Sequence, residues 1–222
     1  MSKKLALVFG GSRGIGAACV EALKEEFEVS STSTANVDIQ KPEDVKRAFD
    51  EAEKRHGRKV DCVVANAGIN VPPGPMAQFD PAGFRKLVEV NIVGAFNVLA
   101  EAARRVADGG SIVAITTSLV RHAAPGLGPY SATKAAVECM VRSMAKELAP
   151  RGVRVNAVAP GPVDTDLFRA GKTEEMKQRS AALSPFNRIG TPAEVAAVVG
   201  FLASDKASWV HGQIVQPNGG MI

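Results

Sequence analysis

The sequence predicts a three-layer α/β fold, in which helices cover both faces of a doubly wound parallel sheet. Short apolar runs alternate along the chain with segments of helical spacing, and such alternation is typical of parallel sheets. Glycine is frequent, at 21 residues, and aromatic residues make up only 5%, which suits tight strand-to-helix turns and aliphatic packing. With 222 residues, 45% of them hydrophobic, and no linker or repeat, the chain is expected to form a single domain over residues 1–222.

The first half of the chain opens with an apolar run at 5–9 that is ended by glycine, as in a buried strand. Ile15, Cys19 and Leu23 then share one stripe of a helix. Pro42 opens the next helix, with acidic residues in its first turn where they suit the helix dipole. The expected elements are strand 5–9, helix 14–26, strand 28–32, helix 42–55 and strand 60–65.

The second half continues the alternation. Asp80 and Pro81 form an N-cap followed by proline at the first helical position, and the helix they open is expected to break near Asn91. Pro150 ends a later helix. The expected elements are helix 80–106, strand 111–116, helix 129–149, strand 153–158, helix 191–203 and strand 213–216. Right-handed crossovers between these elements favour the doubly wound order.

One interval is too short for this pattern. Only a few residues separate the strand ending near Thr32 from a short extended piece at 36–39. A parallel crossover normally takes a dozen or more residues. We therefore expect the helix between strands two and three to be missing, with 30–34 as an exposed turn or an irregular edge.

Composition and charge favour a globular protein with a solvated surface. The net charge of +4 and pI near 9.0 come from scattered basic residues without an aromatic-basic platform, so we do not expect nucleic-acid binding. Cys19, Cys62 and Cys139 lie far apart and are expected to be small buried hydrophobic residues in a reducing compartment. The three histidines are equally isolated, so no metal site is expected.

Targeting signals are weak. The apolar run at 5–9 is shorter than the ~7–15 residues of a secretory core. No run approaches the ~20 apolar residues of a membrane span. We expect a soluble, cytoplasmic protein without membrane contact.

A glycine-rich turn follows the first strand and opens a helix. Gly10 allows the tight turn, Gly14 lets the backbone approach a diphosphate, and Gly16 allows close helix packing. The helix N-terminus would then face the phosphates. The alternative is a structural turn without a ligand, since the spacing differs from the commoner Gly-x-Gly-x-x-Gly.

The end of the second strand indicates which dinucleotide binds. NAD sites usually place an acidic residue there to hold the ribose 2′-hydroxyl. Here the segment 30–34 contains only serine and threonine, and Arg13 in the glycine turn is able to pair with a 2′-phosphate. This favours NADP(H), with NAD(H) possible, although a plain Ser/Thr turn and a solvated arginine would look the same.

A second pattern concerns proton transfer. Tyr130 and Lys134 are four residues apart and share a helix face. A nearby ammonium should lower the pKa of the phenol, so that it can act as general acid or base near neutral pH. Ser118 would donate a hydrogen bond to the substrate oxygen. The Tyr-x-x-x-Lys spacing alone is common on solvated helix faces. Its combination with the glycine-rich turn is what favours a catalytic interpretation.

Together these motifs resemble the short-chain dehydrogenase/reductase family over nearly the full length, and the glycine turn resembles that of 3-oxoacyl-thioester and carbonyl reductases. The resemblance implies a Rossmann-like fold and a catalytic tetrad. The implied catalytic residues are Asn91, Ser118, Tyr130 and Lys134. The implied cofactor-binding residues are Gly10, Ser12, Arg13, Gly14, Ile15, Gly16, Ser33, Thr34, Asp38, Ile39, Asn66, Ala67, Gly68, Tyr130, Lys134, Pro160, Gly161, Val163 and Thr165.

The resemblance also implies roles. Asn91 would hold a water next to the lysine, the Asp38-Ile39 pair would lie near adenine, and the segment 160–165 would contact the nicotinamide carboxamide. Because the serine-to-tyrosine spacing is short, Thr117 could supply the catalytic hydroxyl instead of Ser118.

The segment 162–190 is expected to form a variable substrate lid. Leu167, Phe168, Met176 and Leu183 could line it, or could simply pack a helix, and Arg121 and His122 could reach the pocket mouth. The implied function is NADP(H)-dependent hydride transfer to or from a carbonyl or secondary alcohol. The alternative is a catalytically silent dinucleotide sensor. The resemblance further implies a homotetramer or homodimer packed through helices near 91–106 and 130–149.

Overall fold

The computed structural model describes residues 3–222 and contains a six-stranded sheet in the order β2-β1-β3-β4-β5-β6. All neighbouring strands pair in parallel, as predicted. The strands are β1 (Lys4–Phe9), β2 (Phe27–Ser31), β3 (Cys62–Ala65), β4 (Ser111–Ile115), β5 (Arg154–Val158) and β6 (Ile214–Val215). The chain order changes direction between β1 and β3, which is where open parallel sheets form a binding crevice.

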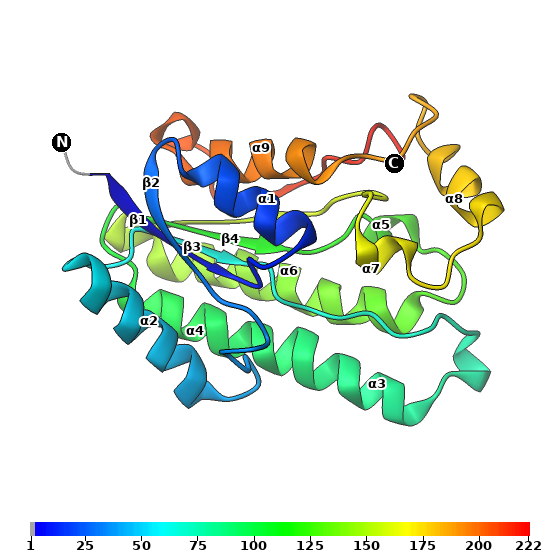
Figure 1. Ribbon diagram of the computed structural model, residues 1–222, viewed down its shortest axis with the longest axis horizontal. Helices are drawn as coiled ribbons and strands as arrows, with labels where there is room; N and C mark the ends of the chain where they lie inside the picture. The colour runs from blue at the N-terminus through cyan, green and yellow to red at the C-terminus, as the bar shows by residue number, and fades with distance from the viewer. Residues whose placement is uncertain (1–2) are drawn as a thin grey trace.

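Helices cover both faces of this sheet (Figure 1). The helices on one face are α1 (Gly14–Leu23) and α9 (Pro192–Ala203); those on the other are α2 (Pro42–His56), α4 (Ala95–Arg105) and α6 (Gly128–Leu148), with α3 (Pro81–Val88) running into α4. The short helices α5 (Leu119–His122), α7 (Asp166–Arg169) and α8 (Glu174–Ala181) gather at one end of the molecule (Figure 1). Single 3-10 turns are found at Met76–Gln78, Ala149–Arg151 and Asp205–Ala207.

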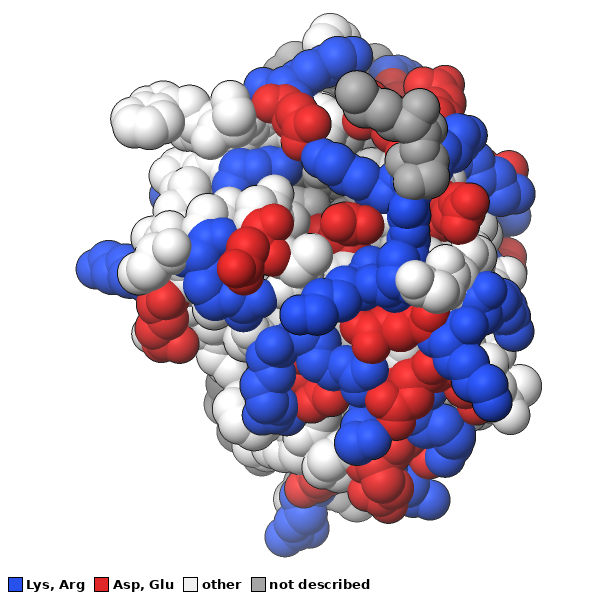
Figure 2. Space-filling view, turned by 90° about the vertical axis from the view of Figure 1, so that its left-hand side faces the viewer, with Lys and Arg blue, Asp and Glu red and all other residues white. Residues whose placement is uncertain are grey.

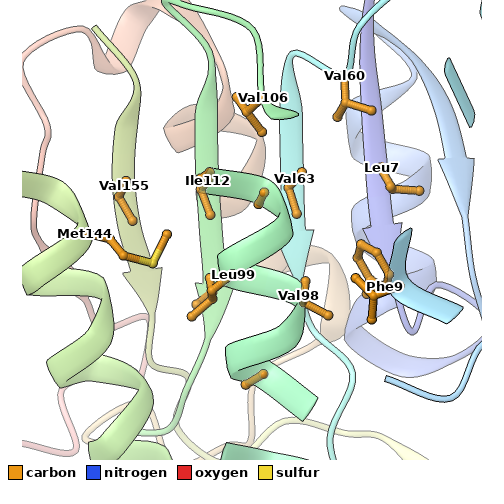
Figure 3. Packing of buried hydrophobic residues seen from close by; sticks show 14 of the residues in the cluster. Leu7, Phe9, Val60, Val63, Val98, Leu99, Val106, Ile112, Met144 and Val155 are labelled. Atoms are coloured by element: carbon orange, nitrogen blue, oxygen red, sulfur yellow. The ribbon is translucent and has the colours of Figure 1, made fainter. Parts of the chain in front are cut away.

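The core consists of two apolar layers, one on each face of the sheet. Leu7 and Phe9 of β1 pack on the side of α4, whose Val98 and Leu99 face Val63 and Ile112 of the neighbouring strands (Figure 3). The alternate residues of β1, Ala6 and Val8, belong to the layer under α1 and α9. Burial on both faces explains why these strands are continuous apolar runs rather than alternating ones.

No helix lies between β2 and the extended piece at 36–39, as predicted. That piece, however, is not a strand of the sheet, so α2 itself forms the crossover from β2 to β3. Val37 and Ile39 are buried in the layer beside α4, and the Asn97 amide donates hydrogen bonds to the carbonyls of Ile39 (2.9 Å) and Gln40 (3.1 Å). A side chain therefore satisfies the backbone that a neighbouring strand would otherwise pair with, and β2 is left as an edge strand.

Three local predictions are tested by the fold. The break near Asn91 is confirmed as a π-helical segment at Glu89–Gly94 between α3 and α4. Ser30 belongs to β2 and is buried, so the turn after β2 is shorter than predicted. Cys19 and Cys62 are buried, and burial raises the pKa of their thiols to about 12 and about 11. Cys139 was expected to be buried but is exposed on α6.

Charges of both signs cover the surface. Figure 2 shows lysine and arginine interspersed with aspartate and glutamate at the end of the molecule where β1 begins. Arg105, for example, binds both Asp50 and Glu53 at 2.5 Å. Across residues 3–222, no helix is long and apolar enough to span a bilayer. Within the same range, no three metal-ligating side chains come together.

Candidate active site

A cleft of about 350 Å³ opens where the carboxyl ends of the strands meet the lid. It is lined by the start of α1, by the turns after β3, β4 and β5, by the start of α6 and by lid residues from α7 and α8. Thr117, Ser118, Tyr130 and Lys134 all line it. These residues, which are distributed over positions 117–134 of the sequence, are thus neighbours in one cavity.

The turn after β1 allows close approach to its backbone. Gly10 has a φ of 78° and Gly14 a φ of 55°, a region that favours glycine. A Cβ on Gly16 would lie 2.0 Å from the Gly10 carbonyl oxygen, so the helix start packs on the turn only with glycine there. The Asn66 amide donates to the same oxygen at 2.9 Å. The tight turn and the close packing are present, while diphosphate binding stays a prediction.

Helix α1 begins without a side-chain cap. Its N-cap residue, Arg13, makes no capping hydrogen bond, and its first turn contains no acidic residue. In contrast, Thr191 and Glu194 form a capping box at α9, and Asp80 caps α3. The first amides of α1 are therefore available to an anion, and the helix dipole favours one. With Ile15 lining the cleft beside them, these residues fit the diphosphate of a dinucleotide.

The segment after β2 lies beside this turn. The Gly11 N–H donates a 2.8 Å hydrogen bond to the Thr32 carbonyl. Ser33 is half-buried and forms a local turn with Asn36, whose side-chain oxygen accepts from the Ser33 N–H at 2.7 Å. Of the predicted cofactor-binding residues in the two segments, Ser12, Arg13 and Thr34 are exposed. Together the two segments thus offer hydroxyl groups, an arginine and no acidic side chain.

The turn Asn66-Ala67-Gly68 after β3 joins the glycine turn to the proton-transfer residues. A Cβ on Gly10 would lie only 2.9 Å from Ala67 Cα. A Cβ on Gly68 would be 3.1 Å from Asn91 Oδ1 and 3.2 Å from Lys134 Nζ. The small residues of this turn therefore let the dinucleotide side and the catalytic side approach each other.

Asn91 lies in the π-helical segment and is fully buried. Its Oδ1 accepts from the Ile69 N–H and its Nδ2 donates to the Ile69 carbonyl, both at 2.9 Å. Nδ2 also lies 3.2 Å from Thr133 Oγ1 on α6. π-Helical segments often occur at functional sites because they redirect a side chain. Here Asn91 ties the loop after β3 to the helix that carries Tyr130 and Lys134; its contact with a water stays a prediction.

Burial acts on both Tyr130 and Lys134. Although part of its side chain remains accessible, burial raises the pKa of the Tyr130 phenol to about 12. Burial lowers the pKa of Lys134 to about 8, and Lys134 Nζ donates to the Ile115 carbonyl at 3.0 Å. The pKa of the phenol is therefore raised in this structure and not lowered as predicted, and its cause is the loss of solvation on burial.

Two hydroxyl groups compete for the role of substrate donor. Ser118 Oγ donates to the Ala159 carbonyl at 2.7 Å and receives a 3.2 Å hydrogen bond from Asn218 Nδ2. Thr117 Oγ1 accepts from the Leu119 N–H at 3.3 Å. No described residue accepts the hydroxyl proton of Thr117, whereas the hydroxyl proton of Ser118 is donated to the Ala159 carbonyl.

The segment after β5 completes the cleft. Pro160, Gly161, Val163 and Thr165 all line it. Thr165 caps α7 by accepting from the Phe168 N–H at 3.1 Å, and its Cγ2 lies 3.3 Å from where a Cβ on Gly14 would be. Of the lid residues expected to form an apolar wall, Leu167, Phe168 and Leu183 line the cleft. The fourth, Met176, is exposed and does not line the cleft. Of the two residues expected at the pocket mouth, His122 lines the cleft, whereas Arg121 is exposed and does not.

Asp38 and Ile39 lie outside this cleft. Ile39 is buried, and a Cβ on Gly94 would be 2.7 Å from its side chain. Asp38 Oδ1 accepts from the Gln40 side chain at 2.9 Å. Their contact with adenine stays a prediction.

Sequence reasoning missed other cleft residues. Lys172 and Met221 line it without having been predicted. Asn218, which donates to Ser118 beside the cleft, was not predicted either. Nothing in the local pattern marks Lys172, because its position depends on the path of the lid.

Comparisons with known proteins agree with this architecture. The family model described as "Enoyl-(Acyl carrier protein) reductase" matches residues 5–222. The chain is 37% identical to an NADPH-dependent aldehyde reductase-like chloroplastic protein of Arabidopsis thaliana, with 100% of the chain and 95% of the relative covered. It is 36% identical to the 3-oxoacyl-[acyl-carrier-protein] reductase MabA of Mycobacterium tuberculosis, with 97% and 91% covered.

Solved structures are similar over the whole fold. A short-chain dehydrogenase from Burkholderia cenocepacia in complex with NADP superposes with a TM-score of 0.90 at 28% identity, covering 99% of this chain and 98% of that one. A dehydrogenase/reductase from Sinorhizobium meliloti gives 0.89 at 28% identity, with 100% and 96% covered. With its glycine turn, six-stranded parallel sheet and Tyr-x-x-x-Lys cleft, the chain belongs to the short-chain dehydrogenase/reductase family of oxidoreductases.

Proposed function

We propose that the protein is an NADP(H)-dependent oxidoreductase that transfers a hydride between the nicotinamide and a carbonyl or secondary alcohol, with Tyr130 as general acid and base. The observation that carries this proposal is the common cleft of Tyr130, Lys134 and the 117–118 hydroxyls, next to an uncapped helix N-terminus. When bound, the nicotinamide would supply or accept the hydride. The chain's own residues would bind the substrate oxygen and move its proton.

The protonation states at neutral pH suit proton donation to a carbonyl. A phenol with a pKa of about 12 is protonated at pH 7 and can donate its proton to the oxygen of a carbonyl as negative charge develops there. Lys134, with a pKa of about 8, is mostly an ammonium at that pH and would stabilise the phenolate left behind. Oxidation of an alcohol would instead need the deprotonated phenol.

NADP(H) is the cofactor that the site and the relatives favour. The segment after β2 has no acidic side chain to repel a 2′-phosphate, and Arg13 is exposed with no salt bridge among the described residues. One relative is named an NADPH-dependent aldehyde reductase and another an NADPH-dependent aldehyde reductase-like protein, and one similar structure contains NADP. We expect Arg13→Ala to weaken NADPH binding more than NADH binding; an equal loss for both would remove Arg13 from the 2′-phosphate site.

The test of the proposed activity is NADPH oxidation with a panel of aldehydes and ketones, in wild type and Tyr130→Phe. Wild type should turn over at least one carbonyl, and Tyr130→Phe should lose most of the rate while still binding NADPH. Activity that survives in Tyr130→Phe would exclude this tyrosine as the acid. The second candidate, a dinucleotide sensor, is favoured if NADPH binds and no carbonyl reacts.

Assembly and location are also proposed. Phe96 on α4 is 56% exposed, on one of the helices expected to pack between subunits, which supports a homotetramer or homodimer. The three free cysteines support a reducing, cytoplasmic environment.

A further inference from the structure

The lid contains five basic side chains, and four of them are neutralised by carboxylates. These four pairs are Arg169–Asp164 (2.7 Å), Lys177–Glu174 (2.6 Å), Arg179–Glu175 (2.6 Å) and Arg188–Glu194 (2.5 Å). Lys172 is the fifth, and it has no carboxylate partner among residues 3–222. It is also the one basic lid residue that lines the cleft.

Lys172 is held in place without being neutralised. Its Nζ donates to the Phe168 carbonyl at 2.7 Å and lies 4.3 Å from the centroid of the Phe168 ring. An ammonium has three donors, so two remain for another partner. The side chain is half-buried, and burial lowers the pKa of the ammonium.

The cleft supplies no counter-charge. None of the residues that line it is aspartate or glutamate. Its walls near the lid are apolar and include Leu127, Leu167 and Leu183. A partly buried cation without an anion is unfavourable, and an incoming anionic group would relieve this.

We propose that Lys172 binds a carboxylate of the substrate, so that the preferred substrates are carbonyl compounds in which an apolar body separates the reacting carbonyl from a carboxylate. The inference rests on the proposed function, which locates the reacting carbonyl at Tyr130. Lys172 would then bind the carboxylate at the end of the substrate away from Tyr130, while Leu167 and Leu183 contact the apolar body between the two polar ends.

The test compares terephthalaldehydic acid with its methyl ester, in which an uncharged ester group replaces the carboxylate. The variant is Lys172→Met, which keeps most of the side-chain length, and the matched control is Lys177→Met, which removes an ion-paired lysine of the same lid. KM is measured from NADPH oxidation, and Kd for each probe is measured by calorimetry on the enzyme loaded with NADP⁺. Calorimetry needs no turnover, so the inference can be tested even if the reaction fails.

Wild type should prefer the acid, and Lys172→Met should raise KM and Kd for the acid about tenfold, which corresponds to ~1.4 kcal/mol. The ester should be affected far less, and Lys177→Met should change neither. The inference is overturned if Lys172→Met weakens the binding of the acid and of the ester equally. It is overturned as well if wild type binds the acid no better than the ester, or binds neither. It is also overturned if the variant mainly weakens NADPH, because the lysine would then serve a cofactor phosphate. Selective acid binding without turnover would support the inference and count against the proposed activity.

Discussion

At the scale of single residues, the reaction depends on how burial changes two neighbouring groups. Desolvation disfavours charge, so it raises the pKa of the Tyr130 phenol and lowers that of the Lys134 ammonium. The phenol is therefore a proton donor at rest. The ammonium is close to losing its proton at mildly alkaline pH, which makes the rate sensitive to pH.

We expect kcat for carbonyl reduction to be constant well below pH 8 and to fall as pH rises through about 8, the pKa of Lys134. Below that pH the ammonium stabilises the phenolate formed when Tyr130 gives up its proton; above it, the cation is lost. Lys134→Met should be slower by roughly 100-fold and should lack this pH limb. The measurement is kcat against pH for both proteins at saturating NADPH. A limb near pH 8 that persists in Lys134→Met would assign it to another group.

The second residue-scale prediction separates the two hydroxyl groups. Thr117 has a free hydroxyl proton, whereas Ser118 donates to Ala159 and accepts from Asn218. Thr117→Val, which keeps the shape, should lower kcat/KM by about 100-fold, as removal of an oxyanion donor does. Ser118→Ala should lower it less and should mainly reduce thermal stability. If Ser118→Ala costs more activity than Thr117→Val, Ser118 is the donor that the sequence predicts.

At the scale of elements, helix ends position the lid and the C-terminal loop around the cleft. α9 follows the lid directly and packs closely on α1, the helix that begins at the glycine turn. Arg154 of β5 is buried beneath the other end of α9. Its guanidinium donates to the carbonyls of Leu202 (2.5 Å), Ala203 (3.2 Å) and Ser204 (3.0 Å). One side chain thus satisfies several carbonyls that a helix end leaves unpaired.

Arg154→Met should therefore lower the free energy of unfolding by about 2–4 kcal/mol, because buried carbonyls lose their donors. The matched control is Arg179→Met, which removes an arginine whose ion pair is exposed on both sides. Such exposed pairs contribute about 0–1 kcal/mol. Urea denaturation of both variants measures the difference. Equal destabilisation of the two would mean that the guanidinium of Arg154 is not what holds the end of α9.

Elements were predictable from sequence where their signal is local. Apolar runs such as 5–9 marked the strands, and the short interval after Thr32 indicated that no helix precedes the piece at 36–39. The piece at 36–39 was misjudged because Asn97, far along the chain, satisfies its backbone. The pKa direction of Tyr130 and the position of Lys172 were likewise beyond sequence, since both depend on what tertiary packing brings around them.

At the scale of the whole molecule, the sheet ends on one side with β2 as an unpaired edge. The edge is short, and polar contacts occupy it: His56 of α2 lies 2.8 Å from Glu28 and 3.2 Å from Ser30. Short edges with polar side chains resist pairing with another chain. Assembly is therefore expected through a helical face, and the α4 side offers the exposed Phe96.

We expect the protein to form a homotetramer or homodimer in solution, and Phe96→Asp to reduce its molar mass, because a charge on that face would be buried without a partner. The matched control is Phe186→Asp, which places the same charge on a lid phenylalanine that is 71% exposed. Light scattering after size-exclusion chromatography gives the mass of each protein. The assembled wild type should also have a Tm that rises with protein concentration, and Phe96→Asp should lose this dependence. A monomeric wild type, or an unchanged mass in Phe96→Asp, would exclude α4 as the contact between subunits.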